Sequence, residues 1–417
     1  MIKEIKKNIS KIDSSDKIFF AVFSFFPLSL ILGNLIINLS FILFAVSFFL
    51  NFQSNKYYFK NKIIYLLSFF FISLCINLIF SLYPINSIPR VIKVFLIILF
   101  IIEVLRVFHK YNQDLLNYIF LGWSIILIIV IIDCVFEIIF GFNTLGFSTT
   151  LTGRIASFFN DELVVGGFVY GFSLFFISYL IHKNSNNYIV VASIIGIIIV
   201  SFLIGERSNF IKLLISIIIF SIFAVRINPL QKILTFLIMI TMVFAIFNFN
   251  KDYKYRYYGQ IKTFIQNDGI IHYYKNSHYG AHHDVALKIF KEFPLFGVGV
   301  KNFRTESGKK KYENLEIKAS NVKQSTHPHQ IHLEFLSETG LFGYLSFTIF
   351  ILISLIISIK NYIKNKNLFQ LAGIIFVLTT LMPILPSGSF LSTYNSAIFW
   401  INFSVMVGFC RSLKSKF

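Results

Sequence analysis

The residues best suited to chemistry lie in one short segment, 325–343. We expect Ser325 or Thr326 to cap a helix, with Pro328 in its first turn. His329 would then lie near the N-terminus of that helix, where the macrodipole disfavours an imidazolium. A neutral imidazole is what a general base requires. The segment therefore makes His329 the leading candidate for a catalytic base.

Acidic side chains follow this histidine along the expected helix. His332 would share the face of His329, and Glu334 and Glu338, four residues apart, would share another face. The alternative interpretation is that all of these are ordinary polar residues at the start of a membrane span.

A metal site is a second alternative for the histidines. In an extended segment, residues two apart point the same way, so His327 and His329 could direct both rings to one ligand. A zinc ion could then be held together with residues of the preceding loop, namely His278, His282 and His283. No single spacing among these residues is diagnostic of zinc.

Two isolated arginines form the second candidate constellation. Arg154 lies in the segment 152–162, and Arg207 lies in the short segment 205–209. A guanidinium binds phosphate well because it is planar, permanently charged and bidentate. The alternative is an interfacial arginine paired with a nearby acid, for which the candidates are Asp161, Glu162 and Glu206. Two such arginines and a histidine at one membrane face favour an anion-binding catalytic site.

Two acids lie inside an apolar run. Asp133 and Glu137 are four residues apart and share one helical face. Acids are costly in hydrocarbon, so they should face the protein interior and find partners there. They could orient Arg154 or Arg207, or they could serve a purely structural hydrogen-bonding role.

An amphipathic helix is predicted at about 281–293, and the turn after it contains Gly297 and Gly299. This Gly-x-Gly turn lacks the strand–helix context and the third glycine of a nucleotide-binding fingerprint. The helix could lie on the membrane surface as part of a lid, or it could pack inside a loop domain.

The elements that position these residues are apolar helices. The 417-residue chain is 56% hydrophobic and only 14% charged, and it contains 53 phenylalanines. A soluble protein this apolar could not cover its surface, and disordered, coiled-coil, collagen-like and disulfide-scaffold classes are excluded. Continuous apolar runs disfavour an outer-membrane barrel.

We predict an all-α polytopic membrane protein with about twelve transmembrane helices. These lie at about 18–34, 35–52, 63–83, 91–108, 118–141, 164–182, 188–204, 209–226, 233–249, 339–360, 368–385 and 390–411.

The net charge of +19 is explained by topology. With both termini in the cytoplasm, basic residues concentrate on the inside, and the short outside connections carry only Arg90, Arg154 and Arg207. No basic soluble domain interleaved with aromatics exists to bind nucleic acid.

The polar segment 250–333, which contains seven of the nine histidines, would be a periplasmic loop domain. It would separate transmembrane helices 1–9 (1–249) from helices 10–12 (334–417).

These features resemble the O-antigen ligase and O-antigen polymerase superfamily of bacterial inner membranes. The ligase signature is a His followed by Asn, Ser or Gln, then nine residues, then Gly-x-x-Gly. The chain matches it completely with His329, Gln330, Gly340 and Gly343. The segments 133–162, 205–209 and 294–304 also resemble family segments, in family order.

The resemblance implies a function at the periplasmic face. The family transfers a glycan from undecaprenyl pyrophosphate to a sugar hydroxyl, and its ligases are regarded as metal-independent inverting glycosyltransferases that need no cofactor. It implies that His329 is the general base or acceptor-positioning residue and that Arg154 and Arg207 hold the pyrophosphate. The family usually adds a basic residue from the large loop, for which the candidates are Arg256, Arg304, His282 and His283; Asp133, Glu334 and Glu338 are possible supporting residues.

Three functions remain open from the sequence. The first is a ligase, with lipid A–core as acceptor, or a polymerase, with a lipid-linked oligosaccharide as acceptor; the His329-Gln330 pair favours the ligase. The second is a transporter of lipid-linked glycans, although the chain shows no internal repeat. The third is a metal-dependent periplasmic hydrolase on the histidine-rich loop.

Overall fold

In the computed structural model, all the regular elements within the part of the chain that it describes are helices. That part comprises residues 10–149, 151, 153–224, 251–259, 276–314, 317, 323–383 and 385–410, with isolated positions between 233 and 274. Within these residues there is no β-strand. The all-α class predicted from the continuous apolar runs is therefore confirmed.

The apolar runs form the principal helices. The ninth run, 233–249, lies outside the described residues apart from isolated positions. The helices of the other runs are α2 (Lys17–Ser24), α3 (Phe26–Leu32), α4 (Asn34–Leu50), α6 (Lys62–Ile79), α7 (Pro84–Lys110), α8 (Gln113–Phe140), α9 (Val165–His182), α10 (Asn187–Leu203), α11 (Arg207–Ala224), α17 (Ile331–Asn365), α18 (Leu368–Thr380) and α19 (Thr393–Gly408).

Fewer helices than predicted meet the requirements for crossing a bilayer. Among the described residues, five are long and apolar enough, or up to seven if each of two bent helix pairs is one span. The predicted run 18–34 is one such pair, α2 and α3, bent by 51°. The predicted run 368–385 is shortened, because α18 ends at Thr380 ahead of Pro383 and Pro386. The count of twelve spans is therefore not confirmed.

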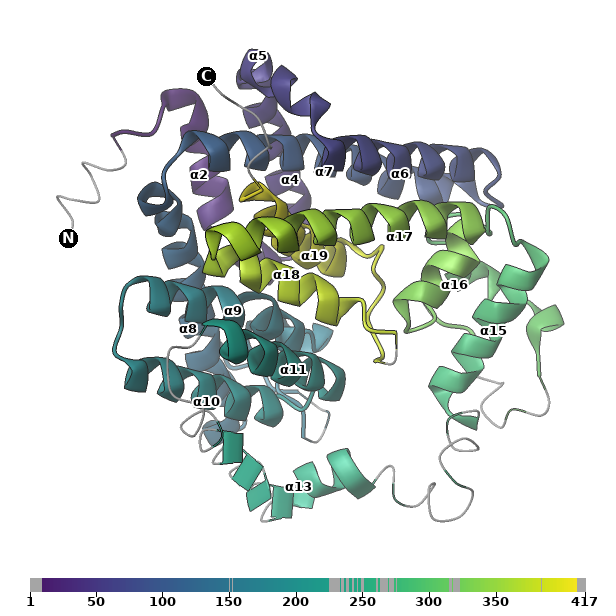
Figure 1. Ribbon diagram of the computed structural model, residues 1–417. Coiled ribbons are helices and arrows are strands. Elements are labelled where there is room, and N and C mark those ends of the chain that lie inside the picture. The colour runs from purple at the N-terminus through teal and green to yellow at the C-terminus, as the bar shows by residue number, and fades with distance from the viewer. Residues whose placement is uncertain are drawn as a thin grey trace.

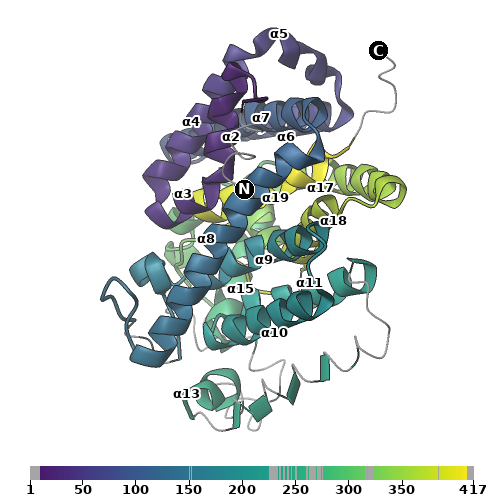
Figure 2. The same ribbon diagram turned by 90° about the vertical axis from the view of Figure 1, so that its left-hand side faces the viewer.

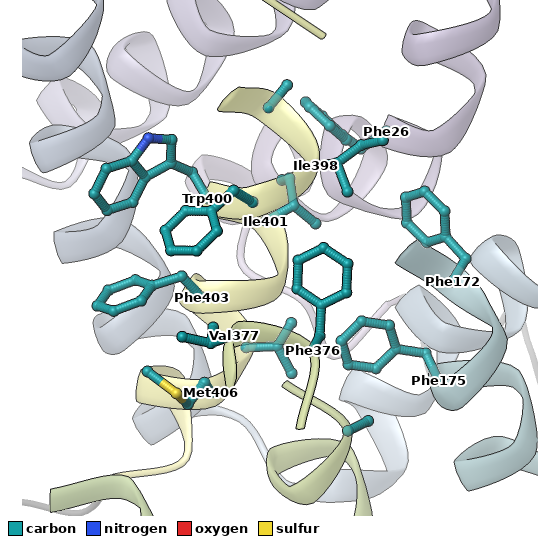
Figure 3. Close-up of a cluster of buried hydrophobic side chains, with 14 of the residues drawn as sticks. Phe26, Phe172, Phe175, Phe376, Val377, Ile398, Trp400, Ile401, Phe403 and Met406 are labelled. Atoms are coloured by element: carbon teal, nitrogen blue, oxygen red, sulfur yellow. The ribbon is translucent and has the colours of Figure 1, made fainter. Parts of the chain in front are cut away.

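The bundle has three groups of helices. In Figures 1 and 2, α17, α18 and α19 lie between α2–α7 and α9–α11. Large aromatic side chains join the groups. Phe376 of α18 lies near Phe175 of α9, whereas Trp400 of α19 lies on the far side of the cluster (Figure 3). Phe347 of α17 contacts Phe70 of α6, with ring centroids 5.3 Å apart. Trp400 and Phe175 are 1% exposed. The central helices are thus fixed by packed aromatic rings on both sides.

The connections predicted to be cytoplasmic come together at one end of the bundle. Arg106 near the end of α7 is buried between Asp16 and Glu103. His109 contacts the carbonyl oxygen of Cys410 at 3.1 Å, and Asn367 donates to Gln113 at 2.9 Å. Several of the connections predicted to be cytoplasmic therefore lie close together in the fold.

The segment between α11 and α17 contains short helices at the opposite end. These are α13 (Lys251–Lys254), the helical turn η4 (Tyr255–Gly259), α15 (His278–Glu292), α16 (Phe303–Glu306) and η5 (Lys310–Tyr312). The amphipathic helix predicted at 281–293 is α15, which lies beside the start of α17 (Figure 1). Its apolar face packs inside this segment, against a small cluster that includes Val298, Phe303 and Tyr312. Packing inside the loop, the second of the two predicted alternatives, is what the structure contains.

A break in α17 anchors this segment to the bundle. Gly340 has φ 64° and interrupts the helix. The carbonyls of Ser337 and Glu338, freed by the break, accept hydrogen bonds from the amides of Val298 and Gly299 at 3.0 and 2.9 Å. Gly297 and Gly299 of the Gly-x-Gly turn thus allow this turn to pack against α17.

Candidate active site

The catalytic candidate His329 lies in the loop immediately before α17. The helix begins at Ile331, and its cap is Gln330, whose side chain accepts from the amide of Leu333 at 2.7 Å. The prediction that Ser325 or Thr326 caps the helix was therefore wrong, because Gln330 supplies the cap. The shared helical face of His329 and His332 was also wrong, since His329 is not helical. It has φ 58°, a left-handed conformation that non-glycine residues seldom adopt.

Aromatic rings from two elements surround the imidazole of His329. Its ring centroid lies 4.0 Å from that of His327 and 5.3 Å from that of His282, which stacks on it. Tyr279, also on α15, approaches its edge at 5.4 Å. His283 lies one residue further along α15. The fold thus brings three of the predicted histidines into ring contact and places the fourth beside them.

Burial favours the neutral form of three of these histidines. Burial, followed by the nearby charges of His282 and His283, lowers the pKa of His329 to about 4. Burial likewise lowers the pKa of His327 to about 3 and that of His283 to about 4. The neutral imidazole predicted for His329 is present, but burial and not the helix macrodipole is its main cause.

The histidines do not form a metal centre in the part of the chain that the structure describes. No group of three or more His, Cys, Asp or Glu side chains there has a geometry that could hold a metal ion. The ring of His282 stacks on that of His329, and the ring of His327 is tilted by 49° to that of His329. The structure therefore gives the zinc alternative no support.

Three arginines gather around a pair of glycines. Arg256 of η4 donates to the carbonyl of Gly205 at 2.6 Å, and Arg207 donates to the carbonyl of Arg256 at 3.3 Å. A Cβ on Gly205 would overlap the carbonyl of Gly153, the residue before Arg154. The glycines thus allow two turns to approach closely enough to place the guanidinium groups together. We call Arg154, Arg207 and Arg256 the arginine cluster.

The arginine cluster has little neutralising charge. The Oε1 atom of Glu206 lies 3.4 Å from Nη2 of Arg154. Glu206 is thus the acidic partner that the sequence offered for Arg154. Within the described residues, neither Arg207 nor Arg256 has a carboxylate oxygen within 4.0 Å. Among the residues that the structure describes, the buried Nε of Arg154 has no hydrogen-bond partner. Burial and the neighbouring cations Arg154 and Arg207 lower the pKa of Arg256 to about 10. Concentrated positive charge of this kind suits an anionic ligand.

The two predicted acids of α8 bind elsewhere. Asp133 accepts from the amide of Thr144 at 2.9 Å and from the hydroxyl of Ser157 at 2.6 Å. Glu137 accepts from the amide of Ser157 at 2.6 Å. Both acids therefore fix the segment that leads to Arg154, which is the structural alternative predicted for them.

The connection between α18 and α19 links the two constellations. The carbonyl of Pro386 accepts from the hydroxyl of Ser208, next to Arg207. The amide of Ser387, one residue on, donates to the carbonyl of His329 at 2.9 Å. We call the described residues 382–383 and 385–392 the strap; it joins the start of α11 to the catalytic candidate.

Glu334 and Glu338 are buried and hold two loops at the start of α17. Glu334 accepts from the hydroxyl of Ser389 and from the amide of Phe390 at 2.7 Å, so it fixes the strap. Glu338 accepts from the amide of Lys301 at 2.7 Å. Both are thus positioning residues in this structure.

The four candidates for an additional basic residue separate in space. Arg256 joins the arginine cluster, whereas His282 and His283 lie with His329. Arg304 is exposed, and its charge acts on Arg90 and Lys301 at a different place. Only Arg256 therefore adds a guanidinium to Arg154 and Arg207.

Buried lysines escaped the sequence analysis, and one of them lies beside the arginine cluster. Lys212 on α11 is 4% exposed, and its ammonium donates to the carbonyl of Pro386 at 3.2 Å. Its signal was available, because a lone lysine inside an apolar run must find a polar environment. Lys212 adds a positive charge beneath the strap.

The fold and site together define a multi-pass helical membrane protein with a basic cluster and neutral histidines outside its apolar helices. Residues 190–348 match the family model described as O-antigen ligase, a stretch that includes Arg207, Arg256 and His329. The resemblance to the O-antigen ligase and polymerase superfamily is therefore confirmed over this region, and a glycosyltransferase-like function of that broad type is supported. No curated protein matches the chain.

Proposed function

We propose that the protein transfers a glycan from undecaprenyl pyrophosphate to a sugar hydroxyl at the periplasmic face of the bacterial inner membrane. The observation that carries the proposal is the arginine cluster, joined through the strap to the neutral His329. The family match over 190–348 supports the same assignment. In this arrangement the termini are cytoplasmic and the segment 250–333 is a periplasmic domain.

The arginine cluster holds the leaving group. As the bond between the anomeric carbon and the pyrophosphate oxygen breaks, negative charge develops on the phosphate. Fixed guanidinium groups stabilise this charge in a site of low dielectric constant. Arg154, Arg207 and Arg256 thus supply the positive charge, and the reaction we propose is metal-independent and uses no cofactor.

His329 removes the proton of the acceptor. The acceptor oxygen forms its bond to the anomeric carbon on the face opposite the pyrophosphate, which inverts the configuration. Its hydroxyl proton passes to the neutral imidazole, and undecaprenyl pyrophosphate is released. Bound pyrophosphate raises the pKa of His329 from its low value, because nearby negative charge stabilises the imidazolium. Donor binding thereby makes the imidazole a stronger base.

We assign the acceptor to lipid A–core, as in a ligase, because of the His329-Gln330 pair in the signature. In the structure Gln330 caps α17 and donates to the carbonyl of Pro383 at 3.0 Å. It therefore fixes the strap relative to His329. A polymerase would use the same donor and machinery with a lipid-linked oligosaccharide as acceptor.

The test is transfer by the purified protein in proteoliposomes. A lipid pyrophosphate donor is offered with each acceptor separately, in the presence of EDTA. We expect product with lipid A–core and EDTA-insensitive rates. Product only with the lipid-linked oligosaccharide would make the protein a polymerase, and no product with either acceptor would contradict the proposal.

A further inference from the structure

A second group of cations lies on the outer half of α7. Arg90 and Lys93 are three residues apart on this helix and so share a face. Lys93 is 8% exposed, and Arg90 is half-buried. Neither residue takes part in the roles proposed above for the base, His329, and for the arginine cluster.

These cations are paired with neutral groups only. Arg90 donates to the hydroxyl of Thr393 at 2.7 Å. The ammonium of Lys93 has Asn38 Oδ1 at 3.3 Å and the carbonyl of Thr393 at 3.4 Å, and it lies over the ring of Phe41 at 5.6 Å. Among the described residues, no carboxylate oxygen lies within 4.0 Å of either cation. A buried ammonium with long contacts to neutral acceptors is incompletely compensated and favours an anion beside it.

The surroundings of the two cations are apolar. Arg90 and Lys93 line a small cavity whose walls include Phe70, Leu391 and Trp400. Beside Lys93, Asn38 lies on the exposed face of α4, which also carries Leu35, Leu39 and Ile42. Cations at the head of a lipid-facing apolar surface match an amphiphile that carries a phosphate above a hydrocarbon chain.

This place is distinct from the arginine cluster. α7 packs against α4, α6 and α19, whereas α11, which begins at Arg207, packs against α9, α10 and α18. The charge that acts on Arg90 comes from Arg304 and Glu338, and the charge that acts on Arg256 comes from Arg154, Arg207 and Glu206. The strap joins the two places, because its Leu391 lines the cavity with Arg90 and Lys93, whereas the carbonyl of Pro386 accepts from Ser208.

The geometry points to a second phosphate site, in which Arg90 and Lys93 hold the phosphate of the acceptor lipid while the arginine cluster holds that of the donor. This inference rests on the proposed function. A transferase with two membrane-borne substrates needs a place for the acceptor lipid that is separate from the place of the donor. The exposed apolar side chains of α4, Leu35, Leu39 and Ile42, would carry the hydrocarbon of the acceptor.

Binding of a phosphate-bearing lipid tests the site without requiring catalysis. The purified full-length protein in detergent is titrated with dioleoyl phosphatidic acid, and binding is counted by native mass spectrometry. We expect Lys93→Met and Arg90→Gln each to weaken binding at least tenfold. Lys183→Met, which removes an exposed cation between α9 and α10, should leave it unchanged. Dioleoylglycerol, which lacks the phosphate, should not bind. Equal binding by the wild type and both α7 variants would overturn the site.

Kinetics in proteoliposomes assign the phosphate to the acceptor. We expect Lys93→Met to raise KM for the acceptor at least tenfold while KM for the donor changes less than twofold. A rise in donor KM alone would overturn the acceptor assignment. So would displacement of phosphatidic acid by phosphatidylglycerol at equal concentration, since the site would then hold bulk phospholipid. If the wild type transfers no glycan but Lys93→Met still loses phosphatidic acid, the proposed function fails and only the phosphate site stands.

Discussion

Gly297 and Gly340 face each other where the turn after α15 meets the break in α17. Both have positive φ, 66° and 64°. A Cβ on Gly297 would lie 2.6 Å from the amide nitrogen of Gly340, and a Cβ on Gly340 would overlap the carbonyl of Leu295. Gly340 is the first glycine of the Gly-x-x-Gly signature. Its role in this structure is to receive the loop that carries Lys301 and Arg304.

Replacement of Gly340 should therefore destabilise the whole outer segment. Gly340→Ala adds backbone strain of about 1–3 kcal/mol and a steric overlap with Leu295. We expect a lower midpoint of thermal unfolding in detergent and loss of transfer activity. Gly196→Ala is the matched control, because a Cβ at this position on α10 meets no atom within 4 Å. It should be neutral or stabilising by up to about 1 kcal/mol. Equal melting of both variants would contradict the docking role.

Loss of Arg256 should weaken donor binding. Arg256→Gln removes one of three guanidinium groups, and charge-assisted hydrogen bonds contribute about 1.5–3 kcal/mol each. We therefore expect kcat/KM for the donor to fall by about 10- to 100-fold, with acceptor KM unchanged. Arg256→Lys should recover part of the loss, because it restores charge without the bidentate fork. The control is Lys291→Gln, which removes an exposed cation of α15. An effect of Arg256→Gln on acceptor KM alone would contradict its place in the donor site.

The pH dependence of transfer should differ between the free protein and the donor complex. Falling pH protonates His329 and abolishes its action as a base, so activity is lost on the acid side. Because its pKa is about 4 in the free protein, kcat/KM should stay constant down to about pH 5. Bound pyrophosphate raises this pKa, so the acid limb of kcat should lie at higher pH. A kcat/KM profile that falls at pH 6.5, the ordinary histidine value, would show that the imidazole is not buried as described.

Local patterns in the sequence predicted the elements better than their contacts. Continuous apolar runs located the helices, and the spacing of His329, Gln330 and Gly340 identified the signature. The break at Gly340 was missed because it depends on a turn 43 residues earlier in the chain, Gly297, docking against it. Long-range approach of this kind leaves no periodic signal.

The composition of the candidate site illustrates the same limit. Arg154 and Arg207 stood out because isolated charges next to apolar runs are conspicuous. The sequence offered Arg256 only as one of four basic candidates, since its contact with Gly205 joins residues about 50 positions apart. The low pKa of His329 was expected from a helix terminus, yet it arises from burial against α15. Both features depend on tertiary packing and not on local pattern.

Transfer by a His329 variant tests the central claim most directly. The wild type, His329→Ala and His278→Ala are compared in proteoliposomes with the lipid pyrophosphate donor, saturating acceptor and EDTA. His278 is the control, because it is an exposed histidine at the start of α15. Loss of a general base lowers kcat by about 10²–10⁴-fold, so His329→Ala should lose at least 100-fold while His278→Ala stays within twofold of the wild type. Wild-type kcat in a folded His329→Ala protein would contradict the proposal that this imidazole accepts the proton of the acceptor.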